Sequence, residues 1–249
     1  MGIADLHIHT SYSWDGTSTI SAILQSAKDK RINVVAITDH DTIAGHAEAL
    51  DLAAQYDIQV IPGVEISTAD GHLLAYFIEK EIPAHLSLIR TIELIGEQGG
   101  ICIAAHPEAK FVHAIQEDSL SVAACIPAFE NILVGVETIN AGLLHQKSNR
   151  AAGFLARRYG LSAVGNSDSH IYWTVGDAVT MFQGTSIASL RKSLLQRSTQ
   201  AIMMAEKREI SYYTQHVSRR FLRIMGWVAY STGPNRSYAM QRISGSRVQ

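Results

Sequence analysis

Cysteine is scarce in this chain, and long apolar runs are missing from it. Only Cys102 and Cys125 occur among 249 residues, and neither belongs to a CxxC pair. This argues against a thiolate zinc site and against a dithiol redox motif. No charged N-terminal region leads into an apolar segment, and no run of about 18 apolar residues could span a membrane. We therefore expect a soluble, cytoplasmic protein without a transmembrane segment.

Two common catalytic motifs are also missing. The chain has no GxSxG sequence, so a serine nucleophile is poorly supported even though Ser167, Asp168 and His170 stand close together. It has no glycine-rich phosphate loop with a following lysine either. These absences argue against serine-hydrolase chemistry and against nucleoside-triphosphate chemistry of the P-loop kind.

The length and composition indicate one large domain followed by a tail of opposite charge. An α/β barrel of roughly 200–250 residues forms a single unit, and 47% hydrophobic with 18% charged residues is ordinary for a globular core. Residues 1–205 carry 13 Lys or Arg and 21 acids, a balance of −8, whereas 206–249 carry eight and two, a balance of +6. We predict a main domain at 1–204 and a basic C-terminal extension at 205–249.

Short apolar runs alternate with longer segments of helical periodicity. Apolar residues three and four positions apart predict helices within 18–30, 43–57, 86–100 and 145–160. Short apolar runs predict strands within 34–37, 58–67, 72–78, 101–108, 131–140 and 161–170. Repeated alternation of this kind is typical of a parallel α/β sheet, either open or closed into a barrel.

Residues of metal-binding type follow the predicted strands. In chain order the strand ends read HIH, TDHD, GVEIS, AAHPE, VETIN and GNSDSH. The carboxyl ends of strands in a parallel α/β fold lie on one face, which is where ligands bind. We therefore expect these side chains to gather along one rim of the sheet.

Histidine is the most informative of these residues. Six of the 11 histidines lie at or beside the strands: His7, His9, His40, His72, His106 and His170. The other five are predicted to be solvated residues of helices or loops: His46, His85, His113, His145 and His216. Side chains two apart on a strand point to the same face, so His7 and His9 can reach one ion, and Asp168 and His170 repeat that spacing.

Two carboxylates extend the candidate site. Glu65 ends a strand and can bridge two cations, and Asp15 lies in a glycine-containing loop after the first histidine pair. Imidazoles packed together without a cation would leave buried nitrogens unpaired, at about 1–3 kcal/mol each. Nitrogen and oxygen ligands without a thiolate suit Mn²⁺, Fe²⁺ or Zn²⁺ and do not suit the all-oxygen cages of Ca²⁺ or Mg²⁺. We expect more than one such ion.

Taken together, these segments resemble a known family. DLHIHTSYSWDG, AITDHDT, GVEIS, HLLAYF, AHP and NSDSH look like the motif set of the PHP (polymerase and histidinol phosphatase) family, in the same order. The resemblance runs from about Ile3 to the region of Leu195. It implies an α/β fold, a distorted (β/α)7 barrel, with two or three divalent metals at the carboxyl ends of its strands.

The resemblance also implies how the ligands are divided among the metals. A first metal would be held by His7, His9, Glu65 and Asp168. Glu65 would bridge to a second metal, which His72 and His106 complete. A third metal would be held by Asp15, His40 and His170. For His72, the role of a satisfied core residue stays open as an alternative.

Two positions depart from the pattern of many relatives. Those relatives follow AHP with an arginine that grips a phosphate, whereas this chain offers Lys110, a point charge rather than a bidentate fork. Glu108 would repel an anionic substrate if it pointed inward. Asp15 stands where some relatives carry histidine, which favours the nucleotide- and RNA-cleaving members over the histidinol phosphatases.

The predicted activity is metal-assisted hydrolysis of a phosphate ester. Two cations about 3.5–4 Å apart lower the pKa of a bridging water and clamp the phosphoryl oxygens. Glu65 would hold the metal pair, and His170 or His40 would protonate the leaving group. Mononucleotides, 3′,5′-bisphosphates and short RNA, as for a 5′–3′ exoribonuclease, all fit as substrates. A histidinol-phosphatase-like phosphomonoesterase is a further alternative.

A function of another class also stays open. The barrel could be a non-catalytic metal-binding scaffold that acts through its basic tail. Residues 216–233 combine Arg219, Arg220 and Arg223 with apolar neighbours, which predicts a cationic amphipathic helix. Such a helix could contact nucleic acid or a membrane surface, or it could pack on the barrel or on a second subunit.

Overall fold

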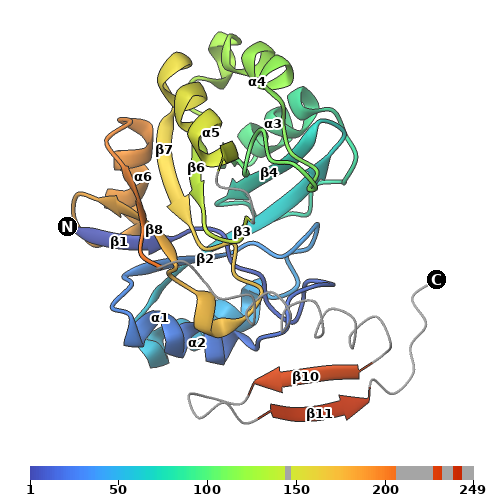
Figure 1. Ribbon diagram of the computed structural model, residues 1–249, viewed down its shortest axis with the longest axis vertical. Coiled ribbons are helices and arrows are strands. Elements are labelled where there is room, and N and C mark those ends of the chain that lie inside the picture. Colours follow the sequence, from blue (N-terminus) through green and yellow to red (C-terminus); the bar gives the residue numbers. More distant parts are fainter. Residues whose placement is uncertain (144–146, 206–226, 232–237, 243–249) are drawn as a thin grey trace.

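Nine strands form one twisted sheet that curls into a nearly closed barrel, with helices packed on its outside (Figure 1). The computed structural model describes residues 1–143, 147–205, 227–231 and 238–242. The strand order across the sheet is β7-β6-β5-β4-β3-β2-β1-β8-β9. This arrangement confirms the predicted α/β barrel, in which β8 and β9 extend the seven strands β1–β7.

The strands and helices have the following bounds. The strands of the barrel are β1 Gly2–Asp5, β2 Val34–Ile37, β3 Gln59–Thr68, β4 Gly71–Tyr76, β5 Ile101–Ala104, β6 Leu133–Asn140, β7 Ser162–Asn166, β8 Ala178–Phe182 and β9 Gln200–Met203. The α-helices are α1 Ile20–Asp29, α2 His46–Tyr56, α3 Leu88–Glu97, α4 Glu117–Ala124, α5 Lys147–Arg158 and α6 Ile187–Leu195. Two short 3₁₀ turns, η1 and η2, cover Pro127–Phe129 and Tyr172–Thr174.

The expectation of an all-parallel sheet is wrong at two places. β4 runs antiparallel to both β3 and β5, and β8 runs antiparallel to β1 and β9. Only Ala69 and Asp70 separate β3 from β4, and a parallel crossover needs a dozen or more residues. The short connection therefore forces a hairpin. As a consequence, the first residues of β4 lie at the same rim as the carboxyl ends of β3 and β5.

Local sequence signals explain where the helices begin and end. The Thr19 hydroxyl accepts a hydrogen bond from the backbone N–H of Ala22 and caps α1, as expected for Thr at this position. Ser87 caps α3 in the same way through the N–H of Arg90. Two residues after α3, Gly99 adopts a left-handed φ of 72°, which glycine reaches without steric cost.

The barrel closes through side chains between β7 and the β8–β9 pair. Within the described residues no backbone ladder joins these strands. The Thr180 hydroxyl accepts from the N–H of Gly165 at 3.0 Å and donates to its carbonyl at 2.9 Å. Thr199 donates to the carbonyl of Ala163 at 2.9 Å. These bonds satisfy the backbone groups of β7 along its open edge, as buried polar groups require.

Beyond residue 205 the structure describes one antiparallel hairpin, β10 Trp227–Ser231 with β11 Tyr238–Arg242. The helix predicted over 216–233 is therefore wrong for 227–231. The rest of that segment lies outside the described residues, and the division of the chain at 204/205 stays a prediction. Among the described helices, none is both long and apolar enough to cross a bilayer.

Two glycine substitutions test this account of barrel closure. A Cβ at Gly165 would lie 2.7 Å from the carbonyl oxygen of Val179, so we expect Gly165→Ala to lower the free energy of unfolding by about 1–3 kcal/mol. A Cβ at Gly153 in α5 meets nothing nearer than the flexible end of Arg157 at 3.7 Å. Gly153→Ala should raise the free energy of unfolding by about 0.4–1 kcal/mol. Urea unfolding measures both, and a neutral Gly165→Ala would contradict closure at this contact.

Candidate metal centre

The structure brings all nine predicted ligand side chains together at one rim of the barrel. His7 and His9 follow β1, Asp15 lies in the β1–α1 loop, and His40 follows β2. Glu65 lies in β3, His72 is near the start of β4, and His106 follows β5. Asp168 and His170 follow β7. His72 reaches the rim only because β4 is antiparallel, so its place at this rim comes from the hairpin and not from a strand end.

Glu65 lies at the middle of the cluster and is 1% exposed. Its Oε2 atom is 3.1 Å from Nε2 of both His7 and His9. Its Oε1 atom is 2.9 Å from Nδ1 of His72 and 3.1 Å from Nε2 of His106. Each oxygen of one carboxylate therefore faces a different pair of histidines, which is the arrangement of a bridging ligand.

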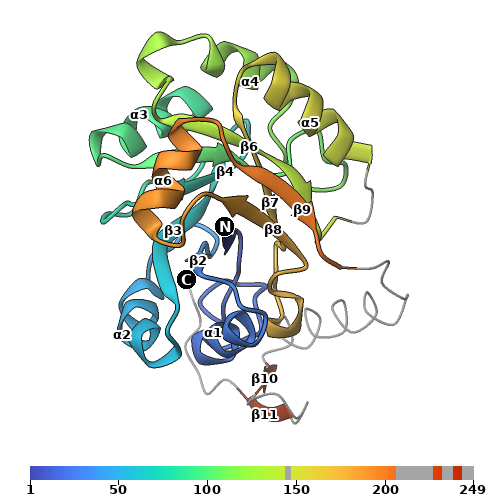
Figure 2. The ribbon, with the colours of Figure 1, turned by 90° about the vertical axis from the view of Figure 1, so that its left-hand side faces the viewer.

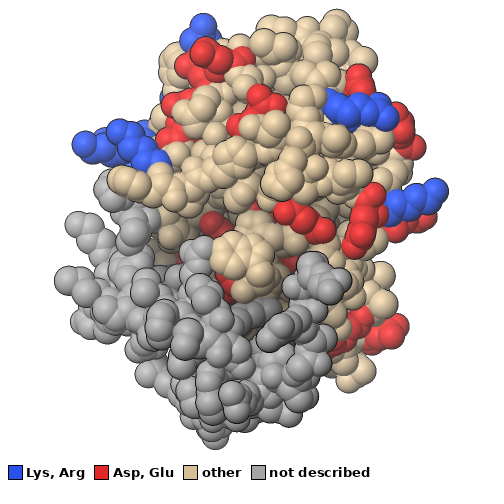
Figure 3. Space-filling view, turned by 90° about the vertical axis from the view of Figure 1, so that its right-hand side faces the viewer, with Lys and Arg blue, Asp and Glu red and all other residues tan. Residues whose placement is uncertain are grey.

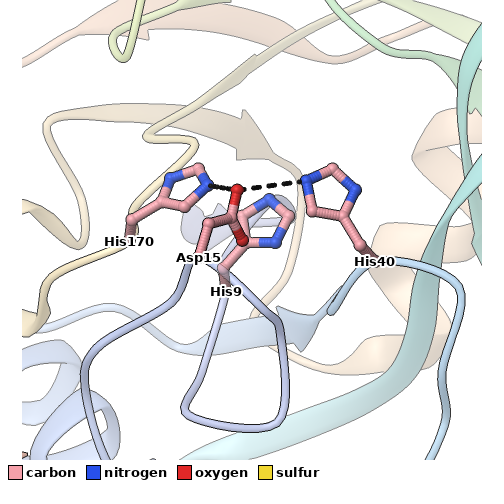
Figure 4. Close-up of side chains that lie close together, drawn as sticks. All are labelled: His9, Asp15, His40 and His170. Atoms are coloured by element: carbon pink, nitrogen blue, oxygen red, sulfur yellow. Dashed lines mark hydrogen bonds and ion pairs between the residues drawn. The ribbon is translucent and has the colours of Figure 1, made fainter. Parts of the chain in front are cut away.

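A second group surrounds Asp15 (Figure 4). Its Oδ2 atom is 3.0 Å from Nε2 of His170 and 3.4 Å from Nε2 of His40. The ring of His9 stacks on that of His170, with centroids 4.2 Å apart, and its centroid is 4.6 Å from that of His40. His9 therefore stands between this group and the one that Glu65 joins.

Hydrogen bonds fix the orientation of several imidazoles. Nδ1 of His7 is 3.0 Å from Oε1 of Glu137, and Nδ1 of His170 is 3.0 Å from the carbonyl oxygen of Asp168. Carboxylate and carbonyl oxygens only accept, so Nδ1 carries the proton in both rings. When these rings are neutral, the lone pair of Nε2 points into the cluster, as in histidines that bind a metal.

The cluster is strongly coupled electrostatically. Burial disfavours the charged form of His9, but Asp168 and Glu65 outweigh it and raise its pKa to about 10. Burial also opposes the charge of Glu65, yet His7 and His40 hold the pKa of that carboxyl well below its usual range. Without a cation, the buried carboxylates therefore require protonated imidazoles as partners. A divalent ion would take the place of those protons.

The geometry fits divalent cations. Three sets of side chains offer ligand atoms within 4.8 Å of one another: His9, Asp15, His40 and His170; His7, His9 and Asp168; and His40, Glu65 and His72. Ligands about 2.0–2.1 Å from a tetrahedral ion lie roughly 3.3–3.5 Å apart, which is close to the contacts seen here. All donors are nitrogen or oxygen, which suits Mn²⁺, Fe²⁺ or Zn²⁺.

Backbone strain marks two of these positions. His106 has a φ of 27° and Asp168 a φ of 51°, both in the left-handed region that side chains rarely adopt. The N–H of His106 donates to Oε2 of Glu137 at 2.8 Å. The amide of Asn140 donates to Oδ2 of Asp168 at 3.0 Å. Strain of this kind persists where surrounding contacts hold it, which is typical of functional sites.

The sequence analysis missed Glu137, the fully buried carboxylate that supports this cluster. Its Oε1 accepts from His7 and from the amide of Asn166 at 2.9 Å. Its Oε2 accepts from the His106 N–H and from the amide of Asn140 at 2.9 Å. The segment VETIN could have indicated it, because this glutamate stands at the end of a predicted strand, as the ligand residues do.

Other predicted residues lie outside the cluster. Lys110 is exposed and makes no ion pair with any residue that the structure describes. Glu108 does not point into the cluster, because its Oε1 accepts from the N–H of Glu117 at 2.7 Å at the start of α4. Ser167 bonds to Asp5 through its backbone N–H at 3.1 Å, so the triad alternative gains no support.

The remaining histidines mostly follow the prediction. His85 and His113 are exposed, although the ring of His113 meets that of His72 edge-on at 5.6 Å. Nε2 of His46 is bonded to the carbonyl of Gly63 at 2.7 Å, so this histidine is not simply solvated. His145 and His216 lie outside the described residues.

The raised pKa of His9 predicts how the metal-free protein responds to pH. Because the folded pKa of about 10 exceeds the ordinary 6.5, the contribution of His9 to stability is complete below pH 6.5 and is lost as the pH rises through about 10. Urea unfolding in the presence of a chelator should therefore show stability falling across this window. His9→Asn should flatten the fall and the exposed control His85→Asn should retain it. An equal slope in all three proteins would contradict the assignment.

The chain is similar to a known family and to several known proteins. The family model described as the PHP domain matches residues 5–204. Uncharacterized protein MJ1587 of Methanocaldococcus jannaschii is 40% identical over 148 residues, covering 55% of this chain and 81% of that protein. A 5′-3′ exoribonuclease of Haemophilus influenzae is 35% identical over 101 residues, covering 39% of this chain and 36% of that protein.

Two further similarities concern a phosphatase and a solved structure. The 3′,5′-nucleoside bisphosphate phosphatase of Chromobacterium violaceum is 33% identical over 96 residues, 37% of this chain and 33% of that protein. The crystal structure of a two-domain protein from Bacteroides vulgatus, containing a predicted PHP-like metal-dependent phosphoesterase, has a TM-score of 0.65. The structural match has 16% sequence identity and covers 97% of this chain and 75% of the Bacteroides vulgatus chain, which shows a shared fold. With the family match over 200 residues and the relative from M. jannaschii, the chain belongs to the PHP domain family.

Proposed function

We propose that this protein is a metal-dependent phosphoesterase that hydrolyses phosphate esters of nucleotides or short RNA. The observation that carries the proposal is Glu65, whose two oxygens each face two histidines at 2.9–3.1 Å. A carboxylate shared in this way can hold two cations side by side, as in two-metal phosphatases and nucleases. The exoribonuclease and the bisphosphate phosphatase among its relatives favour nucleotide substrates.

The proposed ligands are those that the resemblance implied. His7, His9, Glu65 and Asp168 would hold one ion, and Glu65 with His72 and His106 a second. Asp15, His40 and His170 would hold a third. Bound there, the ions would make a nucleophile from water at neutral pH and neutralise phosphoryl oxygens.

Charge balance supports more than one ion. Four carboxylates touch the histidines directly and carry a formal charge of −4: Asp15, Glu65, Glu137 and Asp168. Two divalent cations bring +4 and neutralise them when the imidazoles are neutral. A third leaves an excess of +2, which complements a phosphate monoester of charge about −1.5 to −2.

The other proposed roles belong to side chains near the mouth of the site. The side chains of His170 and His40 are 15% and 10% exposed, whereas those of His7 and His9 are fully buried. A proton for the leaving group would therefore come from His170 or His40, whichever of the two rings is not engaged as a metal ligand. Lys110 would contact the substrate phosphate from the exposed segment that follows His106.

A substrate screen tests the activity. Protein reconstituted with Mn²⁺ is assayed on a mononucleotide, a nucleoside 3′,5′-bisphosphate and a 5′-phosphorylated oligoribonucleotide. We expect metal-dependent hydrolysis of at least one of them, and its loss in Glu65→Gln, because an amide cannot bridge two cations as a carboxylate does. Glu48→Gln is the control, since Glu48 is exposed and, among the described residues, its carboxylate accepts a hydrogen bond from the Tyr12 hydroxyl alone.

Inertness of the metal-loaded protein towards all three substrates would overturn the proposal and favour the scaffold alternative. For an active substrate, the pH–rate profile identifies the proton donor. His170→Asn should abolish the basic limb if His170 is the donor, and a profile with both limbs intact assigns the role to His40.

A second prediction concerns Glu137. The amide nitrogen of Glu137→Gln would face two N–H donors whichever way the side chain turned, so either His7 or the backbone N–H of His106 would lose its acceptor. We expect metal affinity to fall roughly 10–100-fold, as for other residues that orient ligands. Competition with a chromogenic chelator measures it, with Glu48→Gln again as control. Unchanged affinity would show that the ligands are held without Glu137.

A further inference from the structure

An open groove runs along the outside of the barrel where β7 lacks a covering helix. β7 passes into β8 through the short η2 turn, so α5 forms one wall of this groove and β9 the other (Figure 2). Its floor includes Thr138 and Ala163, and its volume is about 810 Å³. None of the proposed metal ligands lines it.

The groove carries positive charge on an otherwise acidic body. Arg150, Arg157 and Arg197 line it, and none of its lining residues is acidic. Residues 1–205 have a net charge of −8, and Figure 3 shows acidic atoms spread over the face drawn there, with Lys and Arg standing out near its margins. The groove therefore combines three guanidinium groups with no acidic side chain in its lining.

Two of these arginines are available to a ligand, and the third is fixed. Arg150 and Arg157 are exposed and form no ion pair with any described residue. Arg197 donates to the backbone carbonyls of Gly160, Leu195 and Glu130, which hold its charge at one end of the groove. Seven residues separate Arg150 from Arg157, or about 10 Å along α5.

One end of the groove lies next to the metal centre. Asn149 lines the groove and exchanges two hydrogen bonds of 3.2 Å with the backbone of Asn140. The side chain of Asn140 in turn donates to Asp168. Two hydrogen-bonded residues therefore connect the groove with a proposed metal ligand. A chain of phosphates that begins at the metals and crosses the rim would meet Arg150 first and Arg157 next.

We propose that this groove binds the phosphodiester backbone of single-stranded RNA downstream of the nucleotide held at the metal centre. The inference rests on the proposed function and narrows its substrate class to oligonucleotides. Arginine suits phosphate through paired N–H donors, and backbone contacts of this kind do not depend on base sequence. A mononucleotide held at the metals does not extend along the groove and gains nothing from it.

The basic C-terminal extension does not fit as the occupant. Residues 206–249 carry a net charge of +6, the same sign as the groove, so their association would be repulsive. The two basic regions instead share a preference for a polyanion. Residues 204 and 205 lead from β9, which forms one wall of the groove, into this extension.

Binding measured without catalysis tests the groove. The full-length protein is treated with a chelator and titrated against 3′-labelled RNA of 12 and of 3 nucleotides by fluorescence anisotropy over a range of salt concentrations. Arg150→Ala/Arg157→Ala removes the two available charges. Arg158→Ala is the control on the same helix, because Arg158 pairs with Glu117 at 2.7 Å and does not line the groove.

We expect the double variant to bind the 12-mer more weakly and with a smaller dependence on salt. Each lost phosphate contact on a single strand reduces the slope of log K against log salt by about 0.7, so two reduce it by about 1.4. When the salt concentration is lowered from 1 M to 0.1 M, the increase in affinity should therefore be about 25-fold smaller in the double variant than in wild type. Binding of the 3-mer and hydrolysis of a mononucleotide should not change, and Arg158→Ala should match wild type.

Several outcomes would overturn the inference. An unchanged slope in the double variant, an equal loss for the 3-mer and the 12-mer, or no binding of RNA by metal-free wild type would each do so. A loss in Arg158→Ala as large as in the double variant would point to general surface charge and reject the groove. Failure of the proposed function appears separately, as absence of hydrolysis with a bound 12-mer.

Discussion

Everything at the rim of this barrel depends on placing negative charge where water is excluded. Glu65, Glu137 and the histidine pair that follows β1 are almost completely buried. Isolated buried charges of this kind are strongly unfavourable, and they persist only when paired, hydrogen-bonded or bound to a metal. The imidazoles satisfy the carboxylates in the metal-free molecule, and their raised pKa values show the strength of that pairing. Cations would make the same arrangement stable without the protons.

The same requirement explains the second layer of contacts. Glu137 connects the ends of four strands. Its four hydrogen bonds reach His7 after β1, the backbone of His106 after β5, and the asparagines that end β6 and β7. One of these asparagines, Asn140, continues to Asp168. The strained backbone at His106 and Asp168 is held by this network. Loops that would otherwise move independently are thereby fixed with respect to one another, which is the preorganisation that metal catalysis needs.

The outer surface of the barrel follows from how it closes. Side-chain hydrogen bonds from Thr180 and Thr199 replace a ladder beside β7, and no helix follows that strand. Because no described helix covers β7, a groove is left on the outside of the barrel. One end of it is connected to the metal centre through hydrogen bonds between Asn149 and Asn140 and between Asn140 and Asp168. The groove therefore results from an irregularity in the strand–helix repeat close to the metal centre.

Much of this protein could be predicted from the sequence. The alternation of apolar runs and helical segments indicated a parallel α/β sheet, because each period reports which face is buried, and the resemblance to the PHP family implied that the sheet closes into a barrel. The histidine and carboxylate pattern at the strand ends indicated the cluster, since the carboxyl ends of parallel strands meet at one rim. Residues such as His7 and His9 were identifiable for this reason: their spacing alone places both side chains on one face.

Tertiary structure decided what depends on contacts between distant segments. Only the hairpin turn of β4 brings His72 to the rim, and only the packed barrel shows that Glu137, buried 130 residues beyond His7, supports that ring. Glu108 was ambiguous in sequence and is turned away by its bond to α4. The groove beside α5 combines arginines from separate elements, and no local pattern marks it. The periodicity of a sequence shows which face of one segment is buried. The pairing of strands, the hydrogen bonds that support a ligand and the lining of a groove depend instead on which distant segments come into contact.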